Sequence, residues 1–107
     1  MADTLTRLEQ TIAARRAGDP DASYVARLCH GGRAKIAQKL GEEATETVIA
    51  AMSGDGKALV SESADLIFHL CVLLAHEGLG LADVMAELDR REGVSGLAEK
   101  AARGGKG

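Results

Sequence analysis

Apolar residues recur at every third or fourth position along most of the 107-residue chain, which is the spacing of amphipathic α-helices. The chain shows no strand signal and no internal repeat. The pattern predicts five helices, over residues 4–17, 21–29 and 33–53, from a turn at 53–56 to about 76, and over 81–91. We therefore expect an all-α fold.

The ends of these segments carry residues that cap or break helices. Asp3 is a suitable N-cap for the first helix, and either Asp21 or Ser23 for the second. Glycine-containing breaks separate consecutive helices: Gly18-Asp19-Pro20, Gly31-Gly32, the turn at 53–56, and Gly78-Leu79-Gly80. In the last helix we expect four apolar residues to face inward: Leu81, Val84, Met85 and Leu88.

The fourth predicted helix is too apolar for one protomer to cover. Residues 66–75 are apolar at every position except His69, so this helix needs neighbours on several sides. A chain of 107 residues offers few other elements for that purpose. The short turn before the helix favours antiparallel packing on the third helix. We therefore predict a homodimer.

Composition agrees with a single helical domain. Hydrophobic residues make up 46% of the sequence, charged residues 27% and aromatic residues only 2%. Alanine and leucine must therefore supply most of the core. We expect one domain over residues 1–103 and a flexible, glycine-rich tail over 104–107.

Charge and hydropathy disfavour nucleic-acid and membrane partners. The net charge is −3, and no aromatic residues are interleaved with basic ones. The longest apolar run, about ten residues, is shorter than the ~20 that span a bilayer, and the N-terminus lacks a secretory signal. We expect a cytoplasmic protein.

The two cysteines, Cys29 and Cys71, are too few for a disulfide framework and lie in apolar surroundings. Neither Cys29 with His30 nor Cys71 with His69 has an established zinc spacing. We expect buried thiols and a hydrogen-bonded core histidine at position 69.

Acidic residues cluster on the third and fourth predicted helices. At about 100° per residue, Glu46 lies about 60° from Glu43 on the third helix, while Glu62 and Asp65 share one stripe of the fourth. Antiparallel packing would bring the two stripes together. Crowded carboxylates repel one another, and a metal ion relieves that repulsion. Because only carboxylate oxygens are available, the pattern favours Mg²⁺ or Mn²⁺ over Zn²⁺.

The alternative is that these acids form an ordinary solvated helix face. Two observations favour the metal site. Glu62 and Asp65 directly precede the apolar segment 66–75, and Glu43 borders the apolar stripe of its own helix. Carboxylates at the edge of a core need partners.

Basic residues extend the acidic stripe of the third helix. Lys35, Lys39, Glu42 and Glu46 fall within about 60° of one another. The two lysines, with Arg33 before them, could hold phosphate groups that a metal also contacts. Equally, they could pair with the neighbouring glutamates on an exposed face.

Longer segments around the acids resemble a known family. Gly41-Glu42-Glu43-Ala44-Thr45-Glu46, a spacer, and Glu62-Ser63-Ala64-Asp65 are similar to the motif of the all-α nucleoside triphosphate pyrophosphohydrolases, which include MazG-like proteins and dimeric dUTPases. Within that superfamily, Ser23-Tyr24 and the runs 39–51, 62–70 and 95–100 resemble the phosphoribosyl-ATP pyrophosphatase family of histidine biosynthesis. The resemblance covers nearly the whole chain.

The resemblance implies a set of metal ligands: Glu43, Glu46, Glu62 and Asp65, which would bind Mg²⁺. It also implies a stand-alone enzyme that cleaves phosphoribosyl-ATP into phosphoribosyl-AMP and pyrophosphate. Its antiparallel helices would form a four-helix-type bundle completed by homodimerisation. One departure is Phe68, where many relatives carry tyrosine.

The chemistry of such a reaction suggests roles for neighbouring residues. Glu42 adjoins the implied ligands and is our candidate to orient or deprotonate the attacking water. The ribosyl 5′-phosphate of such a substrate adds a second anion away from the metal, which needs its own donors. Candidates are Arg27, Arg33, Arg90 and Arg91.

Three other functions stay open at this point. A ferritin-type di-iron centre expects Glu-x-x-His on two helices, whereas here Glu43 is followed by Glu46 and Glu62 by Asp65. A house-cleaning nucleoside triphosphate pyrophosphohydrolase would share the acids but act on other nucleotides. A non-catalytic helical dimerisation module would leave the acids solvated.

Overall fold

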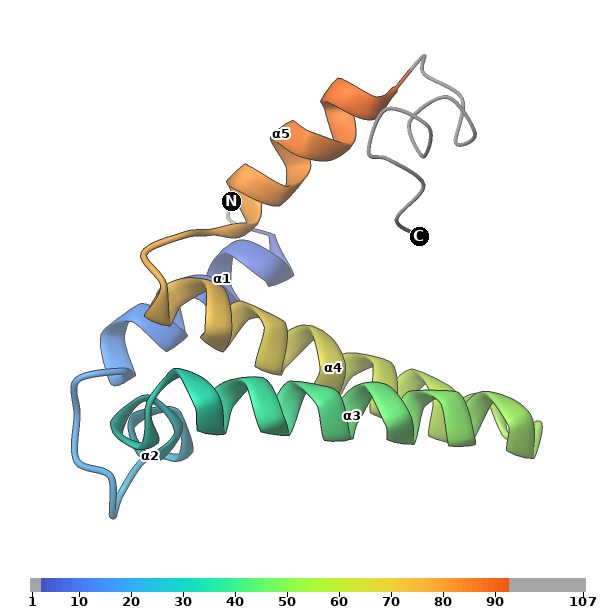
Figure 1. Cartoon of the computed structure of the whole chain (residues 1–107), viewed down its shortest axis with the longest axis horizontal. Coiled ribbons are helices and arrows are strands. Elements are labelled where there is room, and N and C mark those ends of the chain that lie inside the picture. The colour runs from blue at the N-terminus through green and yellow to red at the C-terminus, as the bar shows by residue number, and fades with distance from the viewer. Residues whose placement is uncertain (1–2, 93–107) are drawn as a thin grey trace.

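The computed structural model describes residues 3–92, and every regular element in that range is an α-helix. The helices are α1 (Thr4–Arg15), α2 (Tyr24–Gly31), α3 (Arg33–Ser53), α4 (Gly56–His76) and α5 (Leu81–Arg91) (Figure 1). The predicted all-α fold is therefore confirmed for these residues. The tail predicted for 104–107, and the last part of the predicted domain, lie outside them.

Local hydrogen bonds explain where the first two helices begin. Asp3 caps α1, as predicted, because its side chain accepts a hydrogen bond from the backbone N–H of Thr6 at 2.8 Å. Of the two candidates for α2, Ser23 is the cap, and it accepts from Ala26 N–H at 3.2 Å. Residues before Ser23 form turns on the Asp19 carbonyl, so α2 begins three residues later than predicted.

The two long helices, α3 and α4, form the antiparallel hairpin that the short turn predicts (Figure 1). Gly54 ends α3 at φ 78°, a left-handed conformation that glycine adopts without steric cost. Asp55 then caps α4 by accepting hydrogen bonds from the N–H groups of Lys57 and Ala58 at 3.0 and 3.3 Å. This tight connection sets the register in which residues of α3 face residues of α4.

The hydrophobic core occupies the end of the hairpin where α3 begins and α4 ends. There α1 and α2 pack across the hairpin, and Ile12, Ile36 and Val72 are fully buried. Four further residues complete the core cluster: Val25, Leu28, Cys71 and Leu81. Cys71 is a buried free thiol as predicted, whereas Cys29 is free but only half-buried. Burial raises the pKa of both thiols.

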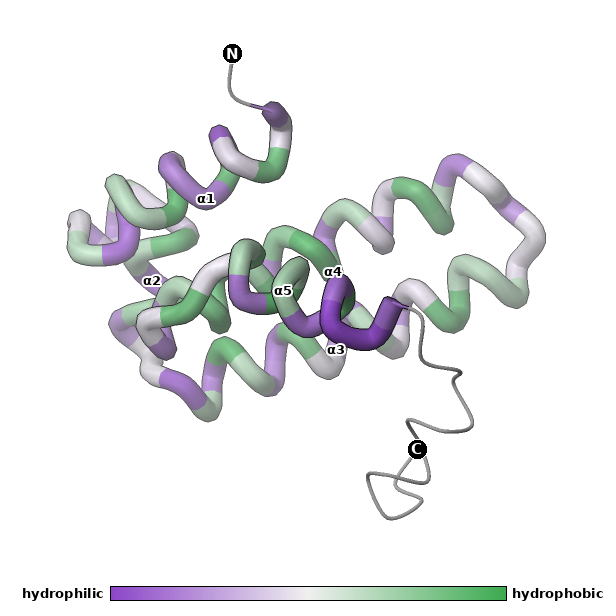
Figure 2. The backbone as a smooth tube through the Cα atoms, turned by 90° about the horizontal axis from the view of Figure 1, so that it is seen from above, coloured by the Kyte–Doolittle hydropathy of each residue, from purple (hydrophilic) through white to green (hydrophobic). Residues whose placement is uncertain are grey.

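The other end of the hairpin extends away from the core and carries hydrophobic residues on both helices (Figure 2). Val48 and Ile49 are each 63% exposed, Met52 83% and Val60 71%. On α4, Ile67 is 43% exposed. With Leu59, these make up six of the ten large hydrophobic residues that are exposed in the described part of the chain.

The expectation that α5 packs its apolar face inward is wrong for half of that face. Leu81 is buried and Val84 half-buried, but Met85 and Leu88 are 46% and 53% exposed. The reason is that α5 leaves the rest of the structure after its first turn (Figure 1). A long-range hydrogen bond fixes its start, from the Leu81 N–H to Glu9 Oε2 on α1 at 2.8 Å.

By length and composition alone, α4 could cross a membrane. It packs against α1, α2 and α3, and it carries Glu62 and Asp65 near its middle. The core helix of a water-soluble protein can have the same length and composition, so these two properties alone do not indicate a membrane span.

Candidate metal and nucleotide site

The hairpin register brings together carboxylates from its two helices. Glu43 and Glu46 are one turn apart on α3, and Glu62 and Asp65 are one turn apart on α4. Glu43, Glu62 and Asp65 each offer one carboxylate oxygen, and these three oxygens lie within 4.8 Å of one another. Glu46 adjoins them, since its side chain interacts with those of both Glu43 and Glu62. The predicted convergence of acids from both helices is present.

Glu43 and Glu62 are not part of an ordinary solvated face, whereas Glu46 and Asp65 are exposed. Glu43 and Glu62 are half-buried, and one oxygen of each, Oε2, is fully buried without a hydrogen-bond partner among the described residues. Burial, followed by the charge of Glu46, raises the pKa of Glu43. The neighbouring Glu46 carboxylate, followed by burial, raises the pKa of Glu62. The protein therefore holds charges in positions that disfavour them unless a cation is near.

The donor set fits a hard divalent cation. Buried, unpartnered carboxylate oxygens at this spacing match the all-oxygen coordination of Mg²⁺ and Mn²⁺. Within residues 3–92, this is the one group of three or more acidic, histidine or cysteine side chains close enough to share an ion. The cysteine and histidine pairs at 29–30 and 69–71 do not gather into such a group.

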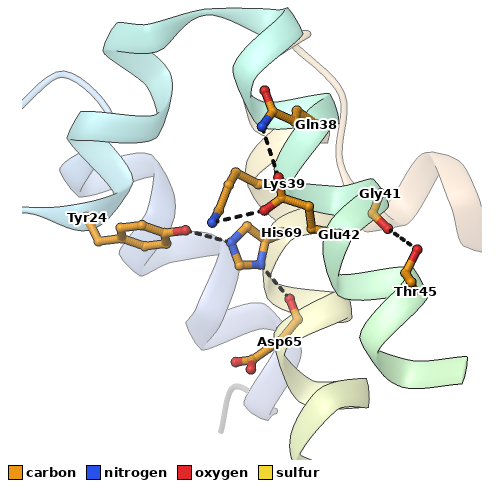
Figure 3. A network of polar contacts seen from close by, with 8 residues as sticks. All are labelled: Tyr24, Gln38, Lys39, Gly41, Glu42, Thr45, Asp65 and His69. Atoms are coloured by element: carbon orange, nitrogen blue, oxygen red, sulfur yellow. Dashed lines mark hydrogen bonds and ion pairs between the residues drawn. The ribbon is translucent and has the colours of Figure 1, made fainter. Parts of the chain in front are cut away.

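Glu42 lies outside the group of three. Its carboxylate accepts a hydrogen bond from Gln38 Nε2 at 2.9 Å and lies 3.4 Å from Lys39 Nζ (Figure 3). These two contacts lower the pKa of Glu42, so its carboxylate is ionised. Our sequence reasoning missed Gln38, although its spacing of four residues from Glu42 on a helix is the signal that could have found it.

The candidate phosphate-binding residues fall into two sets. Lys39 is half-buried beside Glu42, and the charge of Lys35 also lowers the pKa of Glu42, so both lysines lie on the side of the acids. Arg33 instead forms an ion pair with Glu77 at 2.9 Å, where α4 ends. Arg27 donates to the Pro20 carbonyl at 3.1 Å.

The two arginines at the end of α5 also form ion pairs away from the acidic group. Arg90 and Arg91 pair with Glu87 at 2.8 and 2.9 Å, and their hydrogen bonds lower the pKa of Glu87 to about 2. Of the candidate cations, Lys39 interacts with Glu43 of the acidic group, and Lys35 lies near the adjoining Glu42.

His69 is the hydrogen-bonded core histidine that we predicted. It is 4% exposed, its Nδ1 lies 2.7 Å from the Asp65 carbonyl oxygen, and its Nε2 lies 2.9 Å from the Tyr24 hydroxyl. Because a carbonyl can only accept, Nδ1 donates, and in the neutral ring Nε2 then accepts from Tyr24. This pair joins α2 to α4 directly beside a predicted metal ligand.

Tyr24 is not buried, although Val25 and Leu28 on the same helix are. It is 44% exposed, and its ring stacks on Phe68 with centroids 6.0 Å apart and planes 19° from parallel. The helical pattern places Tyr24 near the core face of α2, but it does not show that the ring lies at the edge of the core.

Comparisons with known proteins find relatives that match most of this chain. The family model of phosphoribosyl-ATP pyrophosphohydrolase matches residues 5–92. A protein of Rhizorhabdus wittichii named phosphoribosyl-ATP pyrophosphatase is 69% identical over 103 residues, which is 96% of this chain and 97% of the relative. Proteins of the same name from Erythrobacter litoralis and Novosphingobium aromaticivorans are 67% and 66% identical. They cover 95% and 94% of this chain, and 98% and 94% of their own lengths.

The acidic group should make stability depend on metal and pH. Because the folded-state pKa values of Glu43 and Glu62 are raised, stability in chelator should fall as pH rises through those values and recover with millimolar Mg²⁺. In chelator at about pH 8, Glu43→Gln should raise the melting temperature by a few degrees and weaken the response to Mg²⁺. At about pH 4 the difference should disappear, because both forms are then neutral.

Calorimetry of wild type, Glu43→Gln and the control Asp89→Asn, an exposed acid on α5, provides the measurement. The control should behave as wild type throughout. A lower melting temperature for Glu43→Gln than for wild type, in chelator at about pH 8, would show that carboxylate repulsion does not destabilise the fold.

Proposed function

Because the chain belongs to the phosphoribosyl-ATP pyrophosphohydrolase family, we propose that it hydrolyses phosphoribosyl-ATP to phosphoribosyl-AMP and pyrophosphate in histidine biosynthesis, using Mg²⁺ or Mn²⁺. The observation that carries the metal part is the pair of buried, unpartnered oxygens of Glu43 and Glu62 close to Asp65. These three residues, with Glu46 beside them, are the proposed ligands. We expect this reaction in the cytoplasm, without nucleic-acid or membrane partners.

Each side chain around the acids has a part in the proposed reaction. When bound, the divalent ion would neutralise charge on the triphosphate and orient a water for in-line attack at phosphorus. Lys39 and Lys35 supply cations for the same phosphates. Glu42 holds or deprotonates the attacking water.

The contact between Lys39 and Glu42 suggests how binding prepares the site. In the structure, Lys39 and Gln38 both hold the Glu42 carboxylate. A triphosphate would compete with Glu42 for the Lys39 ammonium, because a triphosphate carries several negative charges and a carboxylate only one. Substrate binding thereby frees one side of Glu42 to accept a hydrogen bond from water.

The proposed assembly is a homodimer in which two hairpins complete a four-helix-type bundle. Its support is the apolar surface at the far end of the hairpin, where Val48, Ile49, Met52 and Val60 are exposed. A second copy offers the same surface, and an isologous contact would remove both from water.

The four proposed ligands can be tested by substitutions that keep the shape of each side chain. We expect kcat/KM to fall by about 100-fold or more in each of four variants: Glu43→Gln, Glu46→Gln, Glu62→Gln and Asp65→Asn. Mutating residues that merely hydrogen-bond to metal ligands already lowers metal affinity or activity by about 10–100-fold. Asp89→Asn should leave pyrophosphate release unchanged. Four variants within about threefold of wild type, with unaltered Mg²⁺ affinity, would refute the ligand set.

A substrate panel tests the proposed reaction itself. Pyrophosphate release should proceed with far higher kcat/KM for phosphoribosyl-ATP than for ATP or dUTP, because binding energy from the ribosyl phosphate is realised in the transition state. Excess chelator should stop the reaction. Equal kcat/KM for all three nucleotides would instead indicate a general house-cleaning pyrophosphohydrolase.

Sedimentation in dilute solution tests the assembly. We expect a homodimer at micromolar concentration, and Ile49→Glu should dissociate it, since it places a charge on the exposed apolar surface. The control Met85→Glu makes the same change on α5, away from the hairpin, and should not. A wild-type monomer under these conditions would overturn the dimer.

A further inference from the structure

The chain places both of its described aromatic rings at one position beside the acidic group. The sequence contains one tyrosine, one phenylalanine and no tryptophan. Tyr24 begins α2 and Phe68 lies on α4, yet the two rings stack on each other. Aromatic rings are the largest contributors of buried apolar area in most cores. Here neither ring is among the fully buried residues, and Tyr24 is 44% exposed.

The Tyr24 ring is nevertheless held rigidly. Phe68 lies against it with centroids 6.0 Å apart, and the buried His69 meets it edge-on with centroids 5.7 Å apart. The hydroxyl is fixed by the 2.9 Å hydrogen bond to His69 Nε2. His69 is itself fixed by its hydrogen bond to the Asp65 carbonyl. A half-exposed ring that is held on one face and at its tip has a prepared surface for a planar ligand.

The position of this ring relative to the acids matches the layout of a nucleotide. Two consecutive hydrogen bonds lead from the Tyr24 hydroxyl through His69 to the backbone of Asp65 (Figure 3). In the same view the Lys39 amino group reaches between the Tyr24 hydroxyl and Glu42. From one side to the other, the view thus presents an aromatic ring, a cation and the Glu42 carboxylate, and Lys39 also interacts with Glu43 of the acidic group. A nucleotide presents a base, its phosphates and the metal bound to them in the same order.

We propose that the exposed face of Tyr24 stacks against the base of the nucleotide and so contributes to substrate selection. This inference rests on the proposed function. It assigns a contact to the base, the part of the nucleotide that neither the metal nor the lysines recognise. Every nucleobase has a π-face that can stack on an aromatic ring. The hydroxyl bond to His69 sets the plane of Tyr24, while the ring supplies the contact.

Intrinsic fluorescence gives a direct test, because Tyr24 is the single tyrosine of a chain without tryptophan. AMP, which carries the base but has no bond between phosphates to cleave, should quench Tyr24 emission in a saturable manner. Ribose 5-phosphate, which lacks the base, should not. Free N-acetyltyrosinamide corrects for absorption by AMP. Absence of saturable quenching by AMP, or equal quenching by ribose 5-phosphate, would overturn the inference.

Kinetics of two variants separate the ring from its hydroxyl. Tyr24→Leu should raise KM for phosphoribosyl-ATP about tenfold, the size of one base–aromatic stacking contact, with a smaller change in kcat. Tyr24→Phe keeps the ring and should stay within about threefold in KM. Inhibition by tripolyphosphate, which has no base, should be equally strong in wild type and both variants.

Failure of this inference and failure of the proposed reaction give different results. If Tyr24→Leu weakens tripolyphosphate and nucleotide alike, the ring supports the site without contacting the base, and the stacking proposal is wrong. If wild type releases no pyrophosphate from phosphoribosyl-ATP but AMP still quenches Tyr24, the reaction is wrong and the stacking contact stands. If wild type turns over phosphoribosyl-ATP but AMP does not quench Tyr24, the stacking proposal is wrong and the proposed reaction stands.

Discussion

Electrostatic repulsion between half-buried carboxylates is the constraint on which the rest of this structure depends. Two helices each project a pair of acids one turn apart, and the hairpin brings three of their oxygens within 4.8 Å of one another. In the described residues no hydrogen-bond donor serves Oε2 of Glu43 or of Glu62. Folding therefore places two carboxylate oxygens where water and protein donors are both missing, and a bound divalent cation would offset the cost.

The remainder of the fold holds this hairpin in register. Asp55 caps α4 immediately after Gly54 ends α3, so the tight turn leaves little freedom to slide one helix past the other. At the opposite end, Ile12, Ile36 and Val72 form a core that clamps α1 and α2 across the hairpin. The acids lie between these two anchors. The hairpin beyond the acids exposes apolar side chains, so the same helices that build the site also carry the surface proposed for assembly.

Much of this architecture could be predicted from the sequence because it depends on residues that are close to one another in the chain. Helical periodicity, an N-cap such as Asp3 and a glycine turn each depend on neighbouring residues. The spacing of Glu62 and Asp65 likewise places both side chains on one side of α4, whatever that helix packs against. Once a short turn implies antiparallel packing, the meeting of the two acidic stripes follows.

The features that could not be predicted depend on contacts between distant segments. The Tyr24–His69 hydrogen bond joins residues 45 positions apart, and the Arg33–Glu77 pair likewise depends on how the ends of α3 and α4 meet. For α5, periodicity shows which face is apolar but not which element covers it. That is why Met85 and Leu88 were expected inside and lie exposed.

We propose that the carboxylates of α3 and α4 bind a divalent cation. A crystal structure with Mn²⁺, located by its anomalous scattering, tests this most directly. We expect one or more peaks about 2 Å from carboxylate oxygens of Glu43, Glu62 and Asp65. An ordered set of these side chains at saturating Mn²⁺ with no anomalous peak among them would contradict it.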